Sequence, residues 1–311
     1  MIILNETIQP GESKTIDMEI ARLHTMTKLK IPIIIHRSKK PGPTVLFCAG
    51  MHGDEINGVE IVRQIIVQKI NRPAIGTIIC VPVVNIFGFV NQKREFPDGR
   101  DLNRVFPGSK TGSLASRFAH NILTEIVPHI DYVIDFHAGG ASRFNAPHIR
   151  IIENDSELKK LAEIFHAPFV LYSRNIVGSF RSACQKKGVK ILLFEGGKSM
   201  DLNAEITQIG LDGAKRFLKN LQMLPSRQTF KKEEKPIVFI RAKSSGMFIG
   251  LVEAGAFVTK GQKIATISDP YGKMEHIIKS PSAGYLINVN QSPIVFQGDA
   301  IFHISTQLSA E

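Results

Sequence analysis

Residues 49–55 (AGMHGDE) place an imidazole and a carboxylate between an apolar run and an amphipathic segment. His52 and Glu55 are three residues apart at the expected start of a helix, so their side chains can converge on one face. Such a pair can supply two zinc ligands, and catalytic zinc sites take three protein ligands and a water molecule. A single pair is a weak motif, and the alternative is that His52 only caps the helix.

A second histidine provides a candidate third ligand. His137 lies in residues 134–140 (IDFHAGG), just past the expected end of another strand. In open α/β sheets, ligands gather outside the carboxyl ends of the strands, so this segment and residues 49–55 can border one crevice. The alternative for His137 is a hydrogen-bonded loop residue.

Glu195 is the candidate general base. It ends the apolar run ILLF (residues 191–194) and precedes Gly196 and Gly197, which leave room for a substrate. A carboxylate in this place can take a proton from metal-bound water. The alternative is a structural ion pair with a nearby Arg or Lys.

Residues 91–108 (NQKREFPDGRDLNRVFPG) form a predicted loop that is rich in cationic and amide groups. It holds Arg94, Arg100, Asn103 and Arg104. Guanidinium groups bind carboxylates in a bidentate manner and stabilise oxyanions. Alone, the loop is typical of a solvated basic surface, but beside a metal site it indicates substrate binding.

The elements around these motifs alternate between strand and helix over residues 1–224. Apolar runs predict strands, and apolar residues at helical spacing predict helices. The predicted strands cover residues 44–49, 77–84, 132–136 and 191–194, and the predicted helices cover residues 57–70, 114–127, 156–165 and 202–221. This alternation predicts an α/β sandwich around a mostly parallel or mixed sheet.

The pattern changes after residue 224. Residues 225–236 (PSRQTFKKEEKP) are polar and bounded by prolines, which predicts a linker. From residue 237 the helical period disappears, and glycines separate short β-rich pieces. We therefore predict a second, all-β domain over residues 237–311.

Four motifs in a fixed order, HGDE, DGRDLNRVFPG, DFHAGG and LLFEGG, resemble the succinylglutamate desuccinylase/aspartoacylase family of zinc carboxypeptidase-like hydrolases. The resemblance covers residues 30–220. It implies a mixed-sheet α/β/α hydrolase domain, dependent on zinc, within residues 1–224.

The resemblance also implies the metal chemistry. His52, Glu55 and His137 would bind one Zn²⁺ per chain. The metal would lower the pKa of its water and polarise the scissile amide, while Glu195 would take the proton and then protonate the leaving amine.

Substrate contacts are implied in the same way. Arg94 would stabilise the oxyanion, and Asn103 and Arg104 would hold the substrate carboxylate. Residues 141–150 resemble a stretch of bacterial family members, in which Arg143 and Asn145 would be pocket residues.

The C-terminal segment, residues 246–304, resembles a biotinyl/lipoyl-like barrel-sandwich domain in its spacing of glycines and of Ser280-Pro281. Residues 273–276 (KMEH) are similar to an attachment hairpin. However, residues 269–272 (DPYG) lengthen the turn, so Lys273 is not expected at its tip. We predict a structural or pocket-shaping module without a modified lysine.

The composition indicates a globular protein of the cytoplasm. The chain has 311 residues, with 39 Lys plus Arg against 28 Asp plus Glu, and a net charge of +11. The basic residues form no long stripe with interleaved aromatic residues, so a small anionic substrate is expected rather than nucleic acid or a membrane. Three scattered cysteines indicate a reducing compartment, and neither a signal peptide nor a membrane-spanning run is found. The sequence leaves a homo-oligomer open.

The preferred function is that of a zinc-dependent deacylase acting on an N-acyl amino acid or a related carboxylated amine. A metallocarboxypeptidase that cuts peptide C-termini would have a nearly identical site. A non-enzymatic carrier or binding protein based on the C-terminal module is the alternative from another class. The motifs GxSxG and HExxH do not occur, which argues against a serine hydrolase and a thermolysin-like protease.

Overall fold

The computed structural model describes residues 1–224, 237–268, 275–292 and 294–305. The strands up to residue 224 are β1 (Ile2–Ile3), β2 (Glu6–Thr7), β3 (Ser13–Arg22), β4 (Lys28–Arg37), β5 (Thr44–Ala49), β6 (Thr77–Val81), β7 (Tyr132–Gly139), β8 (Arg143–Ile151), β9 (Phe169–Tyr172) and β10 (Lys190–Lys198). The helices are α1 (Ile56–Val67), α2 (Ile86–Asn91), α3 (Leu114–Asn121), α4 (Ser156–Phe165), α5 (Phe180–Lys186) and α6 (Ala204–Asn220). Shorter helical turns cover Leu102–Arg104, Ile122–Ile126 and Val127–His129.

The strands after the linker are β11 (Ile237–Arg241), β12 (Gly246–Gly250), β13 (Phe257–Val258), β14 (Lys263–Ser268), β15 (Glu275–Lys279), β16 (Gly284–Asn290), β17 (Ile294–Val295) and β18 (Ala300–Ser305). No helix is found in this described part of the chain. Among the described residues, no helix is both long enough and apolar enough to cross a membrane.

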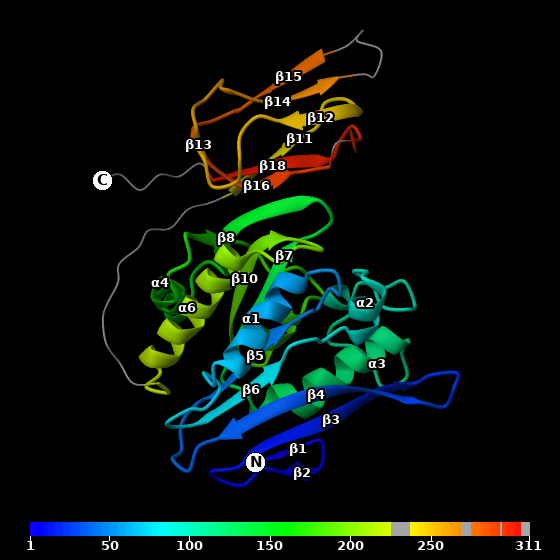
Figure 1. The fold of residues 1–311 in the computed structure, drawn as a ribbon, viewed down its shortest axis with the longest axis vertical. Coiled ribbons are helices and arrows are strands. Elements are labelled where there is room, and N and C mark those ends of the chain that lie inside the picture. The colour runs from blue at the N-terminus through cyan, green and yellow to red at the C-terminus, as the bar shows by residue number, and fades with distance from the viewer. Residues whose placement is uncertain (225–236, 269–274, 293, 306–311) are drawn as a thin grey trace.

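A large mixed sheet forms the centre of the molecule, with the strand order β11-β18-β16-β8-β10-β7-β5-β6-β4-β3 (Figure 1). The inner strands β10, β7, β5 and β6 are parallel to one another, whereas β8 and β4 pair antiparallel on either side of them. The predicted mixed α/β fold is thereby confirmed. Parallel strands in the middle bring the carboxyl ends of β5, β7 and β10 to the same edge of the sheet.

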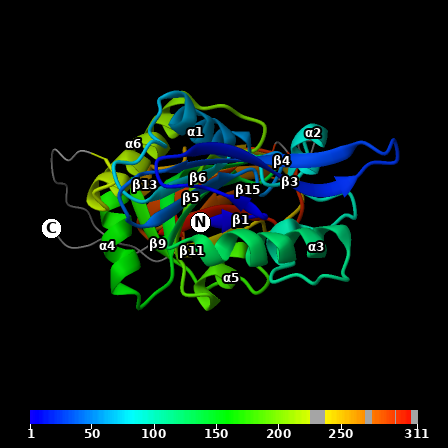
Figure 2. The same ribbon diagram turned by 90° about the horizontal axis from the view of Figure 1, so that it is seen from below.

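Helices cover both faces of this sheet, with α1 and α6 on one side and α3 and α5 on the other (Figure 2). The first face buries Val62 of α1 and Phe217 of α6 in one apolar cluster, and the second buries Phe118 and Phe180 in another. Because both faces are covered, the inner strands read as continuous apolar runs, as in the fully buried β5.

Local sequence signals predicted several elements closely. The bounds of β5 and α4 are those expected, whereas α1 ends at Val67 because Lys69 takes a left-handed backbone conformation (φ 58°). Strand β6 ends before Pro82, which has no N–H to donate to a neighbouring strand.

Two expectations about strand ends were wrong. His137 was expected just past its strand, and Glu195 at the end of another, but β7 continues to Gly139 and β10 to Lys198. Both residues are therefore inside paired strands, where the backbone hydrogen bonds of the sheet hold them in place.

Two glycines allow the backbone to approach closely around the first motif. A Cβ on Gly53 would lie 1.8 Å from the carbonyl carbon of Gly88 in α2, and a Cβ on Gly58 would lie 2.6 Å from the carbonyl oxygen of Phe136 in β7. Gly58 thus lets α1 pack directly on β7, and the turn that carries His52 and Glu55 is held between α2 and the sheet.

The C-terminal strands have an apolar cluster of their own but remain attached to the large sheet. Phe248, Ile264 and Phe302 belong to this cluster, which lies between β16, β18 and the separate sheet β15-β14-β12-β17. Strand β16 also pairs antiparallel with β8, so the central sheet continues into the C-terminal region. The predicted linker, residues 225–236, and the predicted turn with Lys273 lie outside the described residues.

Candidate metal centre

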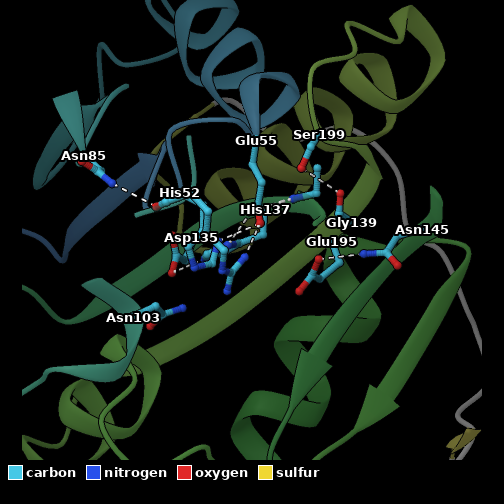
Figure 3. A network of polar contacts seen from close by, with 12 residues as sticks. His52, Glu55, Asn85, Asn103, Asp135, His137, Gly139, Asn145, Glu195 and Ser199 are labelled. Carbon is cyan, nitrogen blue, oxygen red and sulfur yellow. Dashed lines mark hydrogen bonds and ion pairs between the residues drawn. The ribbon is translucent and has the colours of Figure 1, made fainter. Parts of the chain in front are cut away.

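Three predicted ligands meet at the carboxyl ends of the inner parallel strands (Figure 3). His52 and Glu55 lie in the turn between β5 and α1, and His137 lies on β7. The Nδ1 atom of His52 is 2.7 Å from Glu55 Oε1, and Nδ1 of His137 is 2.8 Å from Glu55 Oε2. All three side chains are buried, and one potential ligand atom from each lies within 4.8 Å of the others.

Carboxylates hold the opposite nitrogen of each imidazole. Asp101 Oδ1 lies 3.2 Å from His52 Nε2, and Asp135 Oδ2 lies 3.0 Å from His137 Nε2. In metal sites, a carboxylate on the far ring nitrogen sets the tautomer and the orientation of the ligating histidine. Both rings therefore present Nδ1 to Glu55.

The charges of this cluster reinforce one another. Burial disfavours ionisation of Glu55, but His52 and His137 outweigh it and hold the pKa of Glu55 well below its usual range. Burial likewise favours neutral imidazoles, but Glu55, Asp101 and Asp135 outweigh it and raise the pKa of both histidines. The buried Glu55 carboxylate is thus kept ionised by its two imidazole partners, and an ionised carboxylate in this position can also stabilise a cation.

The donor set fits Zn²⁺. Two imidazole nitrogens and one carboxylate are ligands that zinc prefers, and three is the number typical of a catalytic site. Their close approach in the structure, together with the two supporting carboxylates, is compatible with such an ion.

Sequence reasoning missed Asp101 and Asp135. Asp135 precedes His137 by two residues on the same strand, which puts both side chains on one face of the sheet, so the DFH motif carried a usable signal. Asp101 stands in the DGRD motif, but 49 residues separate it from His52, and only the folded chain joins them.

Replacing Asp135 with Asn should weaken zinc binding by roughly 10- to 100-fold, since an amide is a poorer partner for the imidazole N–H than a carboxylate. Competition with a fluorescent chelator measures this. Asp131→Asn is the matched control, because Asp131 directly precedes β7 and its carboxylate accepts a hydrogen bond from the Thr44 amide, outside the cluster. Equal zinc affinity in Asp135→Asn and the wild type would contradict the supporting role.

Arg94 lies against the same cluster. Its Nε and Nη2 atoms donate to Asp101 Oδ2 (3.1 and 2.8 Å), and Nη1 donates to Glu55 Oε1 (3.2 Å). A guanidinium has five N–H groups, so two remain after these bonds. A Cβ on Gly140 would lie 3.4 Å from Arg94 Nη1, so the glycine leaves space for this side chain.

The other predicted residues of the loop differ in their contacts and in their exposure to solvent. Asn103 Oδ1 accepts from the Phe180 amide (2.8 Å), which leaves its NH₂ group as a donor below the imidazoles in Figure 3. Arg104 is exposed, and its Nη1 donates to the carbonyl of Asn103 (2.7 Å). Arg100 instead pairs with Asp98 (3.2 Å), so it does not contribute to the cluster.

Glu195 lies on the same face of the sheet as His137, since the two residues are register partners across β10 and β7. Its Oε2 accepts from Asn145 Nδ2 (2.8 Å), whereas Arg150, the closest cationic side chain among the described residues, has its Nε 3.9 Å from Oε1. Burial raises the pKa of Glu195, and Arg150 only partly opposes this effect. The geometry does not resemble a tight structural ion pair, and no described residue donates a hydrogen bond to Oε1.

The two predicted pocket residues differ in their surroundings. Asn145 is buried and bonded to Glu195. Arg143, at the start of β8, is partly buried and pairs by register with Asn290 of β16. The structure thus joins Asn145 to the candidate base and leaves Arg143 at the junction with the C-terminal strands.

Comparisons with known proteins agree on one family. A family model of the succinylglutamate desuccinylase/aspartoacylase catalytic domain matches residues 41–221, more than half of the chain. The N-alpha-acetyl-L-2,4-diaminobutyric acid deacetylase of Halomonas elongata is 28% identical over 260 residues, which are 77% of this chain and 74% of that protein.

Solved structures share the fold along nearly the whole chain. The product-bound ectoine utilization protein EutE (DoeB) from Ruegeria pomeroyi has a TM-score of 0.85 at 21% identity, and covers 96% of this chain and 97% of its own. A succinylglutamate desuccinylase/aspartoacylase from Rhodobacter sphaeroides has a TM-score of 0.84 at 23% identity, with 96% and 97% covered. The chain belongs to the succinylglutamate desuccinylase/aspartoacylase family.

Proposed function

We propose that this protein is a zinc-dependent deacylase, which hydrolyses the amide bond of an N-acyl amino acid or a related carboxylated amine. The observation that carries the proposal is the buried cluster of His52, Glu55 and His137 on the same sheet face as Glu195. The family membership and the acylated substrates in the names of the relatives support it.

His52, Glu55 and His137 would hold the metal. When bound, Zn²⁺ supplies a water molecule of lowered pKa and an electrophile for the amide carbonyl. Glu195 takes the proton of the attacking water at Oε1, because Oε2 is already the acceptor of the Asn145 amide. The same carboxyl then gives this proton to the leaving nitrogen, so the C–N bond breaks and a carboxylate and an amine are released.

Cationic and amide groups of the loop would bind the rest of the substrate. The two N–H groups that Arg94 does not use can stabilise the negative charge that develops on the carbonyl oxygen. The NH₂ group of Asn103 and the exposed guanidinium of Arg104 are suited to a substrate carboxylate. Arg143 is proposed as a further pocket residue, at the side where β16 joins β8.

The substrate class can be tested with zinc-loaded protein and a panel of N-acetyl and N-succinyl amino acids, including Nα-acetyl-2,4-diaminobutyrate. We expect release of a free primary amine from at least one of them, at a rate at least ten times that from blocked peptides. Release of C-terminal amino acids from peptides instead would establish the carboxypeptidase alternative. No hydrolysis of any compound by protein with stoichiometric zinc would contradict the proposal.

We further propose that residues 1–224 form the hydrolase domain and residues 237–311 a barrel-sandwich module similar to biotinyl/lipoyl domains. The two facing sheets around Phe248, Ile264 and Phe302 support this division. Intact-mass analysis separates a structural module from a carrier, since a lipoyl or biotinyl adduct on Lys273 would favour the carrier alternative.

The proposed location is the cytoplasm, and the proposed partner is a small molecule rather than nucleic acid or a membrane. Cys48, Cys80 and Cys184 are free and buried, which is compatible with a reducing compartment.

A further inference from the structure

A line of two buried amides connects the C-terminal strands to the candidate base. Asn288 of β16 donates from Nδ2 to Asn145 Oδ1 (2.6 Å), and Asn145 of β8 donates from Nδ2 to Glu195 Oε2 (2.8 Å; Figure 3 shows the second bond). The exposed fractions of Asn288 and Asn145 are 2% and 4%. Three strands, β16, β8 and β10, thus contribute one side chain each to a single chain of hydrogen bonds.

Register shifts in two strands aim these amides at the site. Between the register pairs Glu195–His148 and Gly197–Asn145, β8 contains one residue more than β10, which is a bulge. Without the bulge, Asn145 and His148 would point to opposite faces of the sheet. With it, Asn145 points to the side of Glu195.

The second shift lies in β16. Between the pairs Leu286–Ile304 and Asn288–His303, β16 contains one extra residue relative to β18. Leu286 and Val289 consequently both pack in the C-terminal apolar cluster although they are three residues apart. Asn288 is turned away from this cluster toward Asn145, its register partner on β8.

The acceptor oxygen of Glu195 determines the polarity of the whole line. A carboxylate only accepts hydrogen bonds, so Asn145 must present its NH₂ group to Glu195 and its carbonyl to Asn288. Asn288 must then present its own NH₂ group. Its Oδ1 is buried and has no hydrogen-bond partner among the described residues. Hydrogen bonds within the C-terminal strands therefore do not account for this buried amide.

We propose that Asn288 is a positioning residue for catalysis, through which the C-terminal strands orient the general base. It holds the Asn145 amide in one orientation, and Asn145 in turn fixes Glu195 Oε2 as an acceptor and leaves Oε1 for the proton. This inference rests on the proposed deacylase function, and it assigns to the C-terminal region a part in the reaction that does not require contact with the substrate.

The kinetic test compares Asn288→Ala, Asn145→Ala and the double variant as zinc-loaded proteins. Loss of the neutral amide–amide bond should lower kcat by roughly three- to tenfold, and loss of the bond to the carboxylate by roughly ten- to a hundredfold, with KM and zinc content unchanged. In the Asn145→Ala background, Asn288→Ala should have no further effect on kcat, since the side chain that links it to Glu195 is gone.

Val289→Ala is the matched control, because Val289 is the next residue of β16 but packs in the C-terminal cluster. It should lower the melting temperature and leave kcat unchanged. The proposal is overturned if Asn288→Ala leaves kcat unchanged, raises KM instead, or acts additively with Asn145→Ala. It is also overturned if Val289→Ala lowers kcat as much as Asn288→Ala does.

A second measurement does not depend on turnover. In protein labelled with ¹⁵N-asparagine, the Asn145 side-chain NH₂ signals, identified by their absence in Asn145→Ala, should shift in Asn288→Ala and in Glu195→Gln but not in Val289→Ala. Unchanged signals in Asn288→Ala would overturn the line of hydrogen bonds. A wild-type protein that hydrolyses no substrate but shows these shifts would instead count against the proposed function alone.

Discussion

Glu195→Gln should lower kcat for the N-acyl amino acid by on the order of a hundredfold or more, while zinc remains bound at one ion per chain. Gln is nearly the same size and can still accept from Asn145 Nδ2 through its amide oxygen, so the local structure should persist. What the variant loses is a group that takes a proton from water and returns it to the leaving nitrogen. Steady-state kinetics, with zinc measured by atomic emission, check both parts of the expectation.

An exposed carboxylate supplies the control for this substitution. Glu153→Gln, in the turn after β8, also removes one negative charge but should leave kcat within twofold of the wild type. If Glu195→Gln hydrolyses the substrate at nearly the wild-type rate, Glu195 is not the base. If it loses zinc as well, its carboxylate supports the metal rather than the proton transfer.

The parts of this structure that could be predicted from the sequence are those that depend on local patterns. A run of apolar residues before the HGDE motif predicted β5, and apolar residues at helical spacing predicted α4, because a buried strand and an amphipathic helix each leave a period in the sequence. The three candidate metal ligands were also accessible, since each follows or lies on a strand of the parallel part of the sheet.

The supporting contacts were not accessible in the same way. Asn145 was expected as a pocket residue, which stays a prediction; its contact with Glu195 depends on a bulge in β8 that no local pattern around residues 143–150 reveals. Asn288 is 143 residues from Asn145, and their contact exists only because β16 pairs with β8. Contacts of this kind depend on register between distant strands, which composition and periodicity do not determine.

These long-range contacts also explain why the C-terminal region was hard to interpret from its own residues. Its glycine spacing resembles a carrier module, yet β16 extends the central sheet and pairs with β8, the neighbour of the strand that carries Glu195. A free-standing carrier has no need of a buried Asn288 directed outward from its own apolar cluster. The described strands therefore favour a region that works as part of the hydrolase.

His137→Ala should abolish stoichiometric zinc binding and lower kcat/KM by on the order of a thousandfold or more. The substitution removes one of three ligands, and the metal supplies several kcal/mol of transition-state stabilisation, with each factor of ten worth about 1.4 kcal/mol. Without the imidazole, the buried Glu55 and Asp135 also lose a common partner. The metal-free variant should therefore unfold with a free energy about 3 kcal/mol lower than that of the metal-free wild type.

Because part of this loss could come from destabilisation, the wild type must be tested by chelation as well. Removal of the metal from the wild type should lower activity to the same level as His137→Ala, and added zinc should restore it only in the wild type. His24→Ala, in the exposed turn between β3 and β4, should behave as the wild type throughout. Full activity of the chelated wild type would show that the cluster of His52, Glu55 and His137 serves the fold and not the reaction. In that case the two histidines alone would stabilise the charge of Glu55.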